Sequence, residues 1–172
     1  MTEGAAVGDA KRVVRSRMRE VRASIAADPA DRARRSASIC DRLIASVAQR
    51  RRASEQLHVL VFEPLPGEPD LAVFCAWCSA TEVATYRPVV AGDALLLEPG
   101  SVDPTVLDVV VVPGIAFTSR GDRLGQGGGH FDRFLTGVRE DCLRIGVAFH
   151  EQVVAALPIA DHDVPVDVVI TD

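Results

Sequence analysis

The chain has 172 residues, of which 48% are hydrophobic and 25% charged, so it is long enough to bury the core of one ordinary globular domain. No apolar run approaches the ~18 residues of a membrane-spanning helix, and Met1–Ala10 lacks the apolar segment of a secretion signal. Four cysteines, Cys40, Cys75, Cys78 and Cys142, are too few and too scattered for a disulfide framework. We therefore expect a cytoplasmic monomer with no membrane partner.

Charge is unevenly distributed along a chain whose net charge is −5. Residues 1–52 contain thirteen Lys and Arg against six Asp and Glu, whereas the remainder contains six Arg against eighteen acids. A basic N-terminal region indicates nucleic-acid binding, solvated helix faces, or arginines that turn inward to meet an anionic ligand. Because the basic region has no aromatic residues and the remainder is acidic, we expect no nucleic-acid partner.

Two helices are predicted at the N-terminus, after small and polar residues 1–8 that we expect to be disordered. From Asp9 onward, apolar residues recur at helical spacing at Val14, Met18, Val21 and Ile25, with basic residues on adjoining positions at Lys11, Arg15, Arg19 and Arg22. The pair Asp28-Pro29 ends this helix and can cap a second one that continues to about Gln49.

Strands and helices alternate through the rest of the chain. Strands are predicted at residues 57–62, 82–90 (where Pro88 indicates an edge or an end), 94–97, 106–112, 143–149 and 166–170, with helices at 71–79, 130–138 and 151–156. This alternation predicts one α/β domain over residues 1–172, a three-layer, Rossmann-like fold with a mostly parallel sheet, helices on both faces and an N-terminal helical pair. In such sheets ligands bind at the carboxyl ends of the strands. That rule would bring together the Glu68 loop, the glycine-rich turn and the loop after Phe149.

The stretch Pro113–Asp132 places a glycine-rich turn between a buried strand and a helix start. Its glycines, Gly125, Gly127, Gly128 and Gly129, allow backbone N–H groups to approach a phosphate. The helix start adds the positive end of a dipole, Arg123 can grip phosphate oxygens in a fork, and Asp132 can hold Mg²⁺. The pattern matches neither a Walker loop nor a dinucleotide fingerprint, so a nucleotide-phosphate site and a plain surface turn both stay open.

Several motifs together resemble one enzyme family. The run Arg123-Leu124-Gly125-x-Gly127-x-Gly129-His130-Phe131-Asp132 is similar to the RLGxGxGYYD signature of 5-formyltetrahydrofolate cyclo-ligase, also called methenyltetrahydrofolate synthetase. Its lead-in Val112–Phe117 and the tail segments Gly146–Gln152 and His162–Asp167 also resemble that family. So do Lys11-x-x-x-Arg15 and the loop Gly67-Glu68-Pro69-Asp70.

The resemblance implies an ATP- and Mg²⁺-dependent enzyme that closes 5-formyltetrahydrofolate to 5,10-methenyltetrahydrofolate and releases ADP and phosphate. By the same resemblance, Arg123 and His130 would be catalytic, Glu68, Gln126 and His130 would contact the folate, and Asp132 and Asp163 would hold Mg²⁺. The ATP-binding residues would be Lys11, Arg15, Arg123, Leu124, Gly125, Gln126, Gly127, Gly128, Gly129, His130 and Phe131.

Two features depart from the family pattern, and both lie on the folate side. His130-Phe131 replaces a Tyr-Tyr pair, although a histidine there could still move a proton near neutral pH. The segment from Tyr86 to Pro104, which in the family lines the folate site, is short. These departures leave open a relative that binds ATP but acts on another formyl or amide substrate, such as a thiamine-related compound. A nucleic-acid-binding protein that uses the Arg-rich helices is the non-enzymatic alternative.

Overall fold

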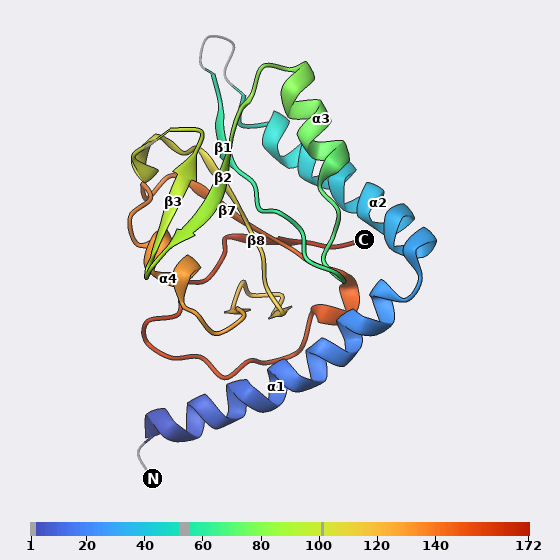
Figure 1. The fold of residues 1–172 in the computed structure, drawn as a ribbon, viewed down its shortest axis with the longest axis vertical. Coiled ribbons are helices and arrows are strands. Elements are labelled where there is room, and N and C mark those ends of the chain that lie inside the picture. The colour runs from blue at the N-terminus through green and yellow to red at the C-terminus, as the bar shows by residue number, and fades with distance from the viewer. Residues whose placement is uncertain (1–2, 52–55, 101) are drawn as a thin grey trace.

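A computed structural model describes residues 3–51, 56–100 and 102–172, and its centre is one twisted sheet of six strands (Figure 1). The spatial order is β3 (Ala94–Glu98), β2 (Ala84–Ala91), β1 (His58–Leu60), β4 (Val109–Val112), β7 (Leu143–Val147) and β8 (Val168–Ile170). All neighbours pair in parallel except β2 and β3, which form an antiparallel hairpin. The chain proceeds outward from β1 on one side and from β4 on the other, so a topological switch point lies between these two strands.

Helices cover both faces of the sheet, as the sequence predicted. One core lies between the sheet and α2 (Pro29–Ala48) with α3 (Ala72–Ala80), and a second core lies under α4 (His130–Leu135). Strand β4 alternates between them: Val109 and Val111 pack in the first core, Val110 and Val112 in the second. A run of four β-branched residues suits this position because both faces of the strand are buried. The remaining short helices are η1 (Pro104–Val106) and η2 (His150–Gln152).

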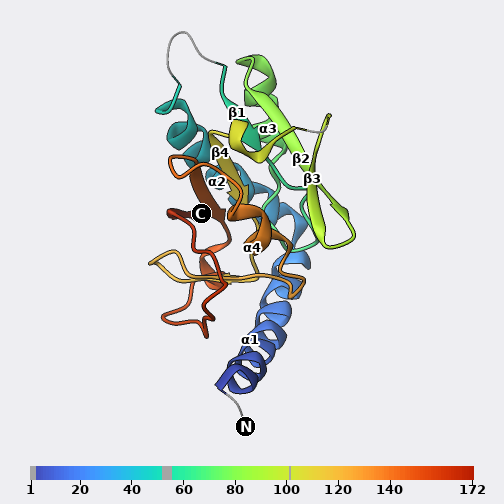
Figure 2. The same ribbon diagram turned by 90° about the vertical axis from the view of Figure 1, so that its left-hand side faces the viewer.

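The long helix α1 (Glu3–Ala26) lies beyond one end of the sheet and leads into α2 (Figure 1). Its apolar stripe at Val14, Met18 and Val21 packs on a small hairpin of β5 (Ala116–Phe117) and β6 (Arg123–Leu124). From the side, the β2–β3 hairpin stands next to α4 (Figure 2). Within the described residues, no helix combines the length and apolar character needed to cross a membrane.

Some predicted boundaries were wrong. The first helix begins at Glu3 and not at Asp9, so residues 3–8, expected to be disordered, are helical; residues 1 and 2 lie outside the described part. Ala5 and Ala6 favour a helix, and half-buried Val7 gains contacts by continuing it. The strand expected from Val106 begins at Val109, because the Asp103 side chain caps a 3-10 turn over Pro104–Val106.

The two C-terminal helices are shorter than predicted. Helix α4 ends at Leu135 because Gly137, whose N–H donates to Phe134, turns the chain. The segment expected to be helical over 151–156 has only the 3-10 turn η2, after which Val153 pairs with Phe117 and Val154 donates to the Phe117 carbonyl. Likewise β8 spans 168–170 within the predicted 166–170.

Pro88 lies inside β2, which is an interior strand of the sheet. The pairing of β2 with β1 ends at Tyr86, so beyond that residue β2 pairs only with β3. Pro88 therefore sits where β2 is locally an edge, and its missing N–H leaves no ladder hydrogen bond unmade toward β1.

Candidate active site

A cavity of about 510 Å³ opens at the carboxyl ends of β1 and β4, at the topological switch point. Its walls come from α1, the glycine-rich loop after β6, the β2–β3 hairpin and the loop around residues 160–163. Every residue that the sequence assigned to a site lines this one cavity: Lys11, Arg15, Glu68, Arg123, Leu124, Gly125, Gln126, Gly127, Gly128, Gly129, His130, Phe131, Asp132 and Asp163. Residues up to 152 positions apart therefore meet at one place.

The loop between β6 and α4 has little room for side chains. Gly127 and Gly129 adopt positive φ angles of 115° and 66°, which favour glycine, and Gly129 caps α4. A methyl group on Gly125 would lie 2.8 Å from Arg123 Nη1, and one on Gly128 would lie 2.6 Å from His130 Nδ1. Because α4 has only six residues, its dipole adds less than we expected, and the exposed loop backbone is the main potential anion contact.

Arg123 lies at the wall of the cavity with only 6% of its surface exposed. Its Nη2 donates to Asp132 Oδ1 at 2.5 Å, so the residue expected to hold phosphate is paired with a residue expected to hold Mg²⁺. Its Nε is shielded from solvent and has no hydrogen-bond partner among the described residues. A buried donor without a partner is costly, so the guanidinium is only partly satisfied here.

Lys11 and Arg15 fasten helix α1 to the cavity. Lys11 Nζ lies 2.7 and 2.5 Å from the two carboxylate oxygens of Asp163, and Arg15 Nε donates to the Gly125 carbonyl at 2.9 Å. Asp163 also accepts from the Ala160 N–H at 2.7 Å. Burial alone would raise the pKa of Asp163, but the hydrogen bonds from Lys11 and Ala160 outweigh it and lower that pKa. Asp163 is therefore a carboxylate at neutral pH.

Glu68 reaches the cavity wall but is already bonded through both oxygens. Oε1 lies 3.0 Å from Arg22 Nη2, and Oε2 accepts from the Leu65 N–H at 2.9 Å. Burial raises the pKa of Glu68, against the opposing effects of the Leu65 N–H and Arg22. Gly67 permits this arrangement, since a Cβ there would lie 2.4 Å from the Arg22 carbonyl oxygen. The Arg22–Glu68 pair thus fixes the 65–68 loop on α1. An acidic residue expected to be buried after Pro66-Gly67 needs a cationic partner, so this pairing could have been suspected from the sequence.

The individual residues of the apolar part of the cavity were not predicted. Val7 of α1, Leu65, and Val90 with Leu95 of the β2–β3 hairpin line it. The short segment between Tyr86 and Pro104 therefore still contributes a wall. His162 also lines the cavity, largely exposed, with Nε2 3.9 Å from Asp163 Oδ1.

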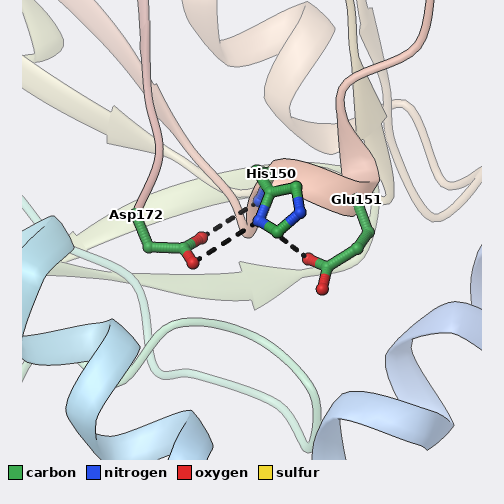
Figure 3. Close-up of side chains that lie close together, drawn as sticks. All are labelled: His150, Glu151 and Asp172. Carbon is green, nitrogen blue, oxygen red and sulfur yellow. Dashed lines mark hydrogen bonds and ion pairs between the residues drawn. The ribbon is translucent and has the colours of Figure 1, made fainter.

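A second group of side chains that could bind a metal ion, His150, Glu151 and Asp172, lies outside the cavity lining (Figure 3). The guanidinium of buried Arg35 bonds to this group, with Nε 2.6 Å from Asp172 and Nη2 2.5 Å from Glu151, and it stacks 4.7 Å from the centre of the Phe149 ring. The single positive charge of Arg35 is already shared by both carboxylates. The group is therefore a clamp that ties α2 to the C-terminal residues, and His150 does not reach the cavity lining.

Comparison by sequence matches residues 91–172 to the model of the 5-formyltetrahydrofolate cyclo-ligase family. A Caenorhabditis elegans protein named probable 5-formyltetrahydrofolate cyclo-ligase is 38% identical over 69 residues, which cover 37% of this chain and 34% of that protein. The 5-formyltetrahydrofolate cyclo-ligase of Escherichia coli K12 is 39% identical over 66 residues, covering 38% and 36%. The matched stretch thus spans about a third of the length of these curated relatives.

Comparison by structure covers nearly the whole chain. A 5,10-methenyltetrahydrofolate synthetase from Mycoplasma pneumoniae superposes with a TM-score of 0.83 at 22% identity, covering 94% of this chain and 98% of that one. The Aquifex aeolicus 5,10-methenyltetrahydrofolate synthetase gives 0.76 at 28% identity, covering 93% and 88%. The predicted α/β fold class is confirmed. The predicted resemblance to the 5-formyltetrahydrofolate cyclo-ligase family is likewise confirmed, over residues 91–172 by sequence and over nearly the whole chain by fold.

Proposed function

We propose that this protein is an enzyme that converts 5-formyltetrahydrofolate to 5,10-methenyltetrahydrofolate at the expense of ATP, with Mg²⁺, releasing ADP and phosphate. The observation that carries the proposal is the gathering, in one cavity at the switch point, of a glycine-rich loop, three basic side chains and the two aspartates Asp132 and Asp163. The names of the matched relatives supply the substrate class.

The residues present fit a polyphosphate and its metal ion. Arg123 has an unpartnered buried Nε, and the loop 125–129 has backbone that side chains would otherwise cover. Asp132 and Asp163 are carboxylates held by cations, and such oxygens are the ligands that Mg²⁺ prefers. ATP supplies the phosphoryl group that makes the formyl oxygen a leaving group. The protein's part in phosphoryl transfer is positioning and charge neutralisation.

Under this proposal the cavity has two functional parts. Lys11, Arg15, Arg123 and the loop Leu124–Phe131 hold the phosphates, while Asp132 and Asp163 hold Mg²⁺. Glu68, Gln126 and His130 orient the folate, whose aromatic rings suit the wall formed by Val90 and Leu95. His130 follows the glycine loop and is half-buried, so its imidazole can contact a substrate in the cavity as a hydrogen-bond donor or acceptor.

ADP release tests the proposal. Wild-type protein with ATP and Mg²⁺ should release ADP only when 5-formyltetrahydrofolate is added, and Asp132→Ala should abolish that release. In binding assays Arg123→Ala should weaken ATP more than folate, and an equal loss of both would argue against a phosphate clamp. ADP release that ignores the folate would contradict the proposed substrate.

A related substrate is the second candidate, favoured by His130-Phe131 where the family pattern has two tyrosines. His130→Tyr should leave the folate-dependent activity equal or higher if folate is the substrate. A large loss of activity would instead favour the other formyl or amide substrate. Nucleic-acid binding is less well supported, because Lys11, Arg15, Arg22 and Arg35 all turn inward to protein partners. Salt-dependent binding of DNA or RNA would revive it.

A further inference from the structure

Two of the three cations expected to hold phosphate, Lys11 and Arg123, are already paired with carboxylates expected to hold metal. Lys11 binds both oxygens of Asp163, and Arg123 binds Asp132. The side chains of Lys11 and Asp163 are only 10% and 13% exposed, and those of Arg123 and Asp132 only 3% and 16%. At such burial an ion that loses its partner is poorly stabilised by water.

The cavity as a whole offers no excess of positive charge to a polyanion. Three basic side chains line it, Lys11, Arg15 and Arg123, and Arg15 is engaged with a carbonyl. Four acidic side chains line it as well: Glu63, Glu68, Asp132 and Asp163. A phosphate chain that entered alone would draw the two paired cations away and leave two carboxylates beside its own negative charge.

Both ion pairs hold the same segment of chain. Asp163 accepts from Ala160 within the segment, and Asp132 Oδ1 accepts from the Val164 N–H at 3.1 Å as well as from Arg123. Residues 160–164 are therefore fastened to α1 at one point and to the start of α4 at another. A ligand that breaks one pair disturbs the support of the other.

We propose that these two ion pairs make the site bind a polyphosphate more tightly when a divalent cation binds with it. The pairs exchange partners: the phosphates take Lys11 and Arg123, and the metal ion takes Asp163 and Asp132. Each ligand compensates the charge that the other exposes, so the binding of the two is positively coupled. This inference rests on the proposed function, because it assumes that the cavity is a polyphosphate site.

Calorimetry with inorganic tripolyphosphate, with and without Mg²⁺, tests the coupling without turnover. Coupling between ligands usually amounts to about 5- to 150-fold, so Mg²⁺ should tighten binding to wild-type protein about tenfold or more. Asp163→Asn keeps an oxygen for the Ala160 N–H but releases Lys11. It should therefore bind metal-free tripolyphosphate more tightly than wild type does, and its response to Mg²⁺ should shrink several-fold.

Asp161→Asn is the matched control, because Asp161 is an exposed neighbour outside the cavity lining and the change in charge is the same. At equal ligand and metal concentrations this variant should bind tripolyphosphate as wild type does. Mg²⁺ that binds free tripolyphosphate in solution affects all the proteins equally, so its effect cancels when variants are compared. Asp132→Asn repeats the test on the other pair, and melting curves verify that each variant is folded.

Two results would overturn the inference. One is wild-type binding that is equally tight with and without Mg²⁺; the other is weaker metal-free binding by Asp163→Asn. Either one, alongside folate-dependent ADP release, would leave the proposed function standing. A wild-type protein that binds no tripolyphosphate under any condition and releases no ADP would remove both.

Discussion

A methyl group added at Gly125 tests the role of the phosphate loop while leaving the rest of the fold in place. The φ of Gly125 lies outside the positive range, so alanine meets no backbone penalty there. Its Cβ would lie 2.8 Å from Arg123 Nη1, and that guanidinium is held by Asp132 at 2.5 Å. The side chain has to shift, and the new methyl group also covers loop backbone that faces the cavity.

The magnitude follows from what Arg123 is proposed to do. A hydrogen bond to a charged group contributes about 1.5–3 kcal/mol, and about 1.4 kcal/mol corresponds to tenfold in affinity. Displacing the guanidinium from one phosphate contact should therefore weaken ATP binding by roughly 10- to 100-fold. Folding should change little, since Gly-to-Ala replacement at a permitted φ contributes about 0.4–1 kcal/mol of stability, which offsets the local shift.

Calorimetric titration of ATP with Mg²⁺ measures the effect, together with a melting curve of the same sample. Gly137→Ala is the control: it also lacks a positive φ, lies outside the cavity lining, and its Cβ would be 3.4 Å from the Phe134 carbonyl oxygen. It should bind ATP as wild type does. Unchanged ATP affinity in a folded Gly125→Ala protein would refute the placement of phosphate at this loop.

Three further predictions concern stability and reactivity. Gly121→Ala should lower the unfolding free energy by about 2 kcal/mol or more in urea titration, because φ is 94° and its Cβ would lie 2.1 Å from the Val166 carbonyl oxygen; near-native stability would contradict this. Arg35→Met should lower the unfolding free energy by about 2 kcal/mol. This is less than the loss usual for a deeply buried ion pair, because Glu151 is partly exposed. The hydrogen bond from Arg35 lowers the pKa of Glu151. Burial opposes the same effect at Asp172, but the hydrogen bond from Arg35 still lowers the pKa of that carboxyl. The stabilisation of the wild type should therefore be complete above about pH 5 and be lost as pH falls through these lowered pKa values. The variant should lose less stability over that range, and equal acid sensitivity would argue against the clamp. Burial raises the pKa of Cys78 to about 12 and of Cys142 to about 11, so both should resist iodoacetamide at pH 8 until the protein unfolds, as mass spectrometry would show; labelling as fast as that of half-buried Cys75 would count against it.

Local patterns predicted most elements of this fold. The valines before Pro113 alternate between two cores, and Asp28 caps α2 as expected, its side chain accepting from Asp31. Boundaries failed where contacts distant in sequence decide them. Val7 extends α1 because the cavity lies beside it, and Val153 leaves the helical path because it pairs with Phe117. Neither partner can be identified from local spacing.

The candidate site shows the same division. The rule that ligands gather at strand carboxyl ends predicted that the Glu68 loop, the glycine loop and the loop after Phe149 would meet. The first two line the cavity, whereas His150, which directly follows Phe149, does not. The pairing of Lys11 with Asp163 joins positions 152 residues apart, so only the folded chain reveals it. The same holds for Arg22 with Glu68, and for the apolar wall from Val90 and Leu95. The residue types in the sequence indicated the chemistry of the site, whereas the contacts among these residues are set by the fold.

The most direct measurement is the absorbance of purified protein mixed with 5-formyltetrahydrofolate, ATP and Mg²⁺. The methenyl chromophore should appear only when ATP and Mg²⁺ are both present, and Arg123→Ala should slow its appearance. No chromophore from folded protein that binds ATP in the same buffer would contradict the proposed reaction.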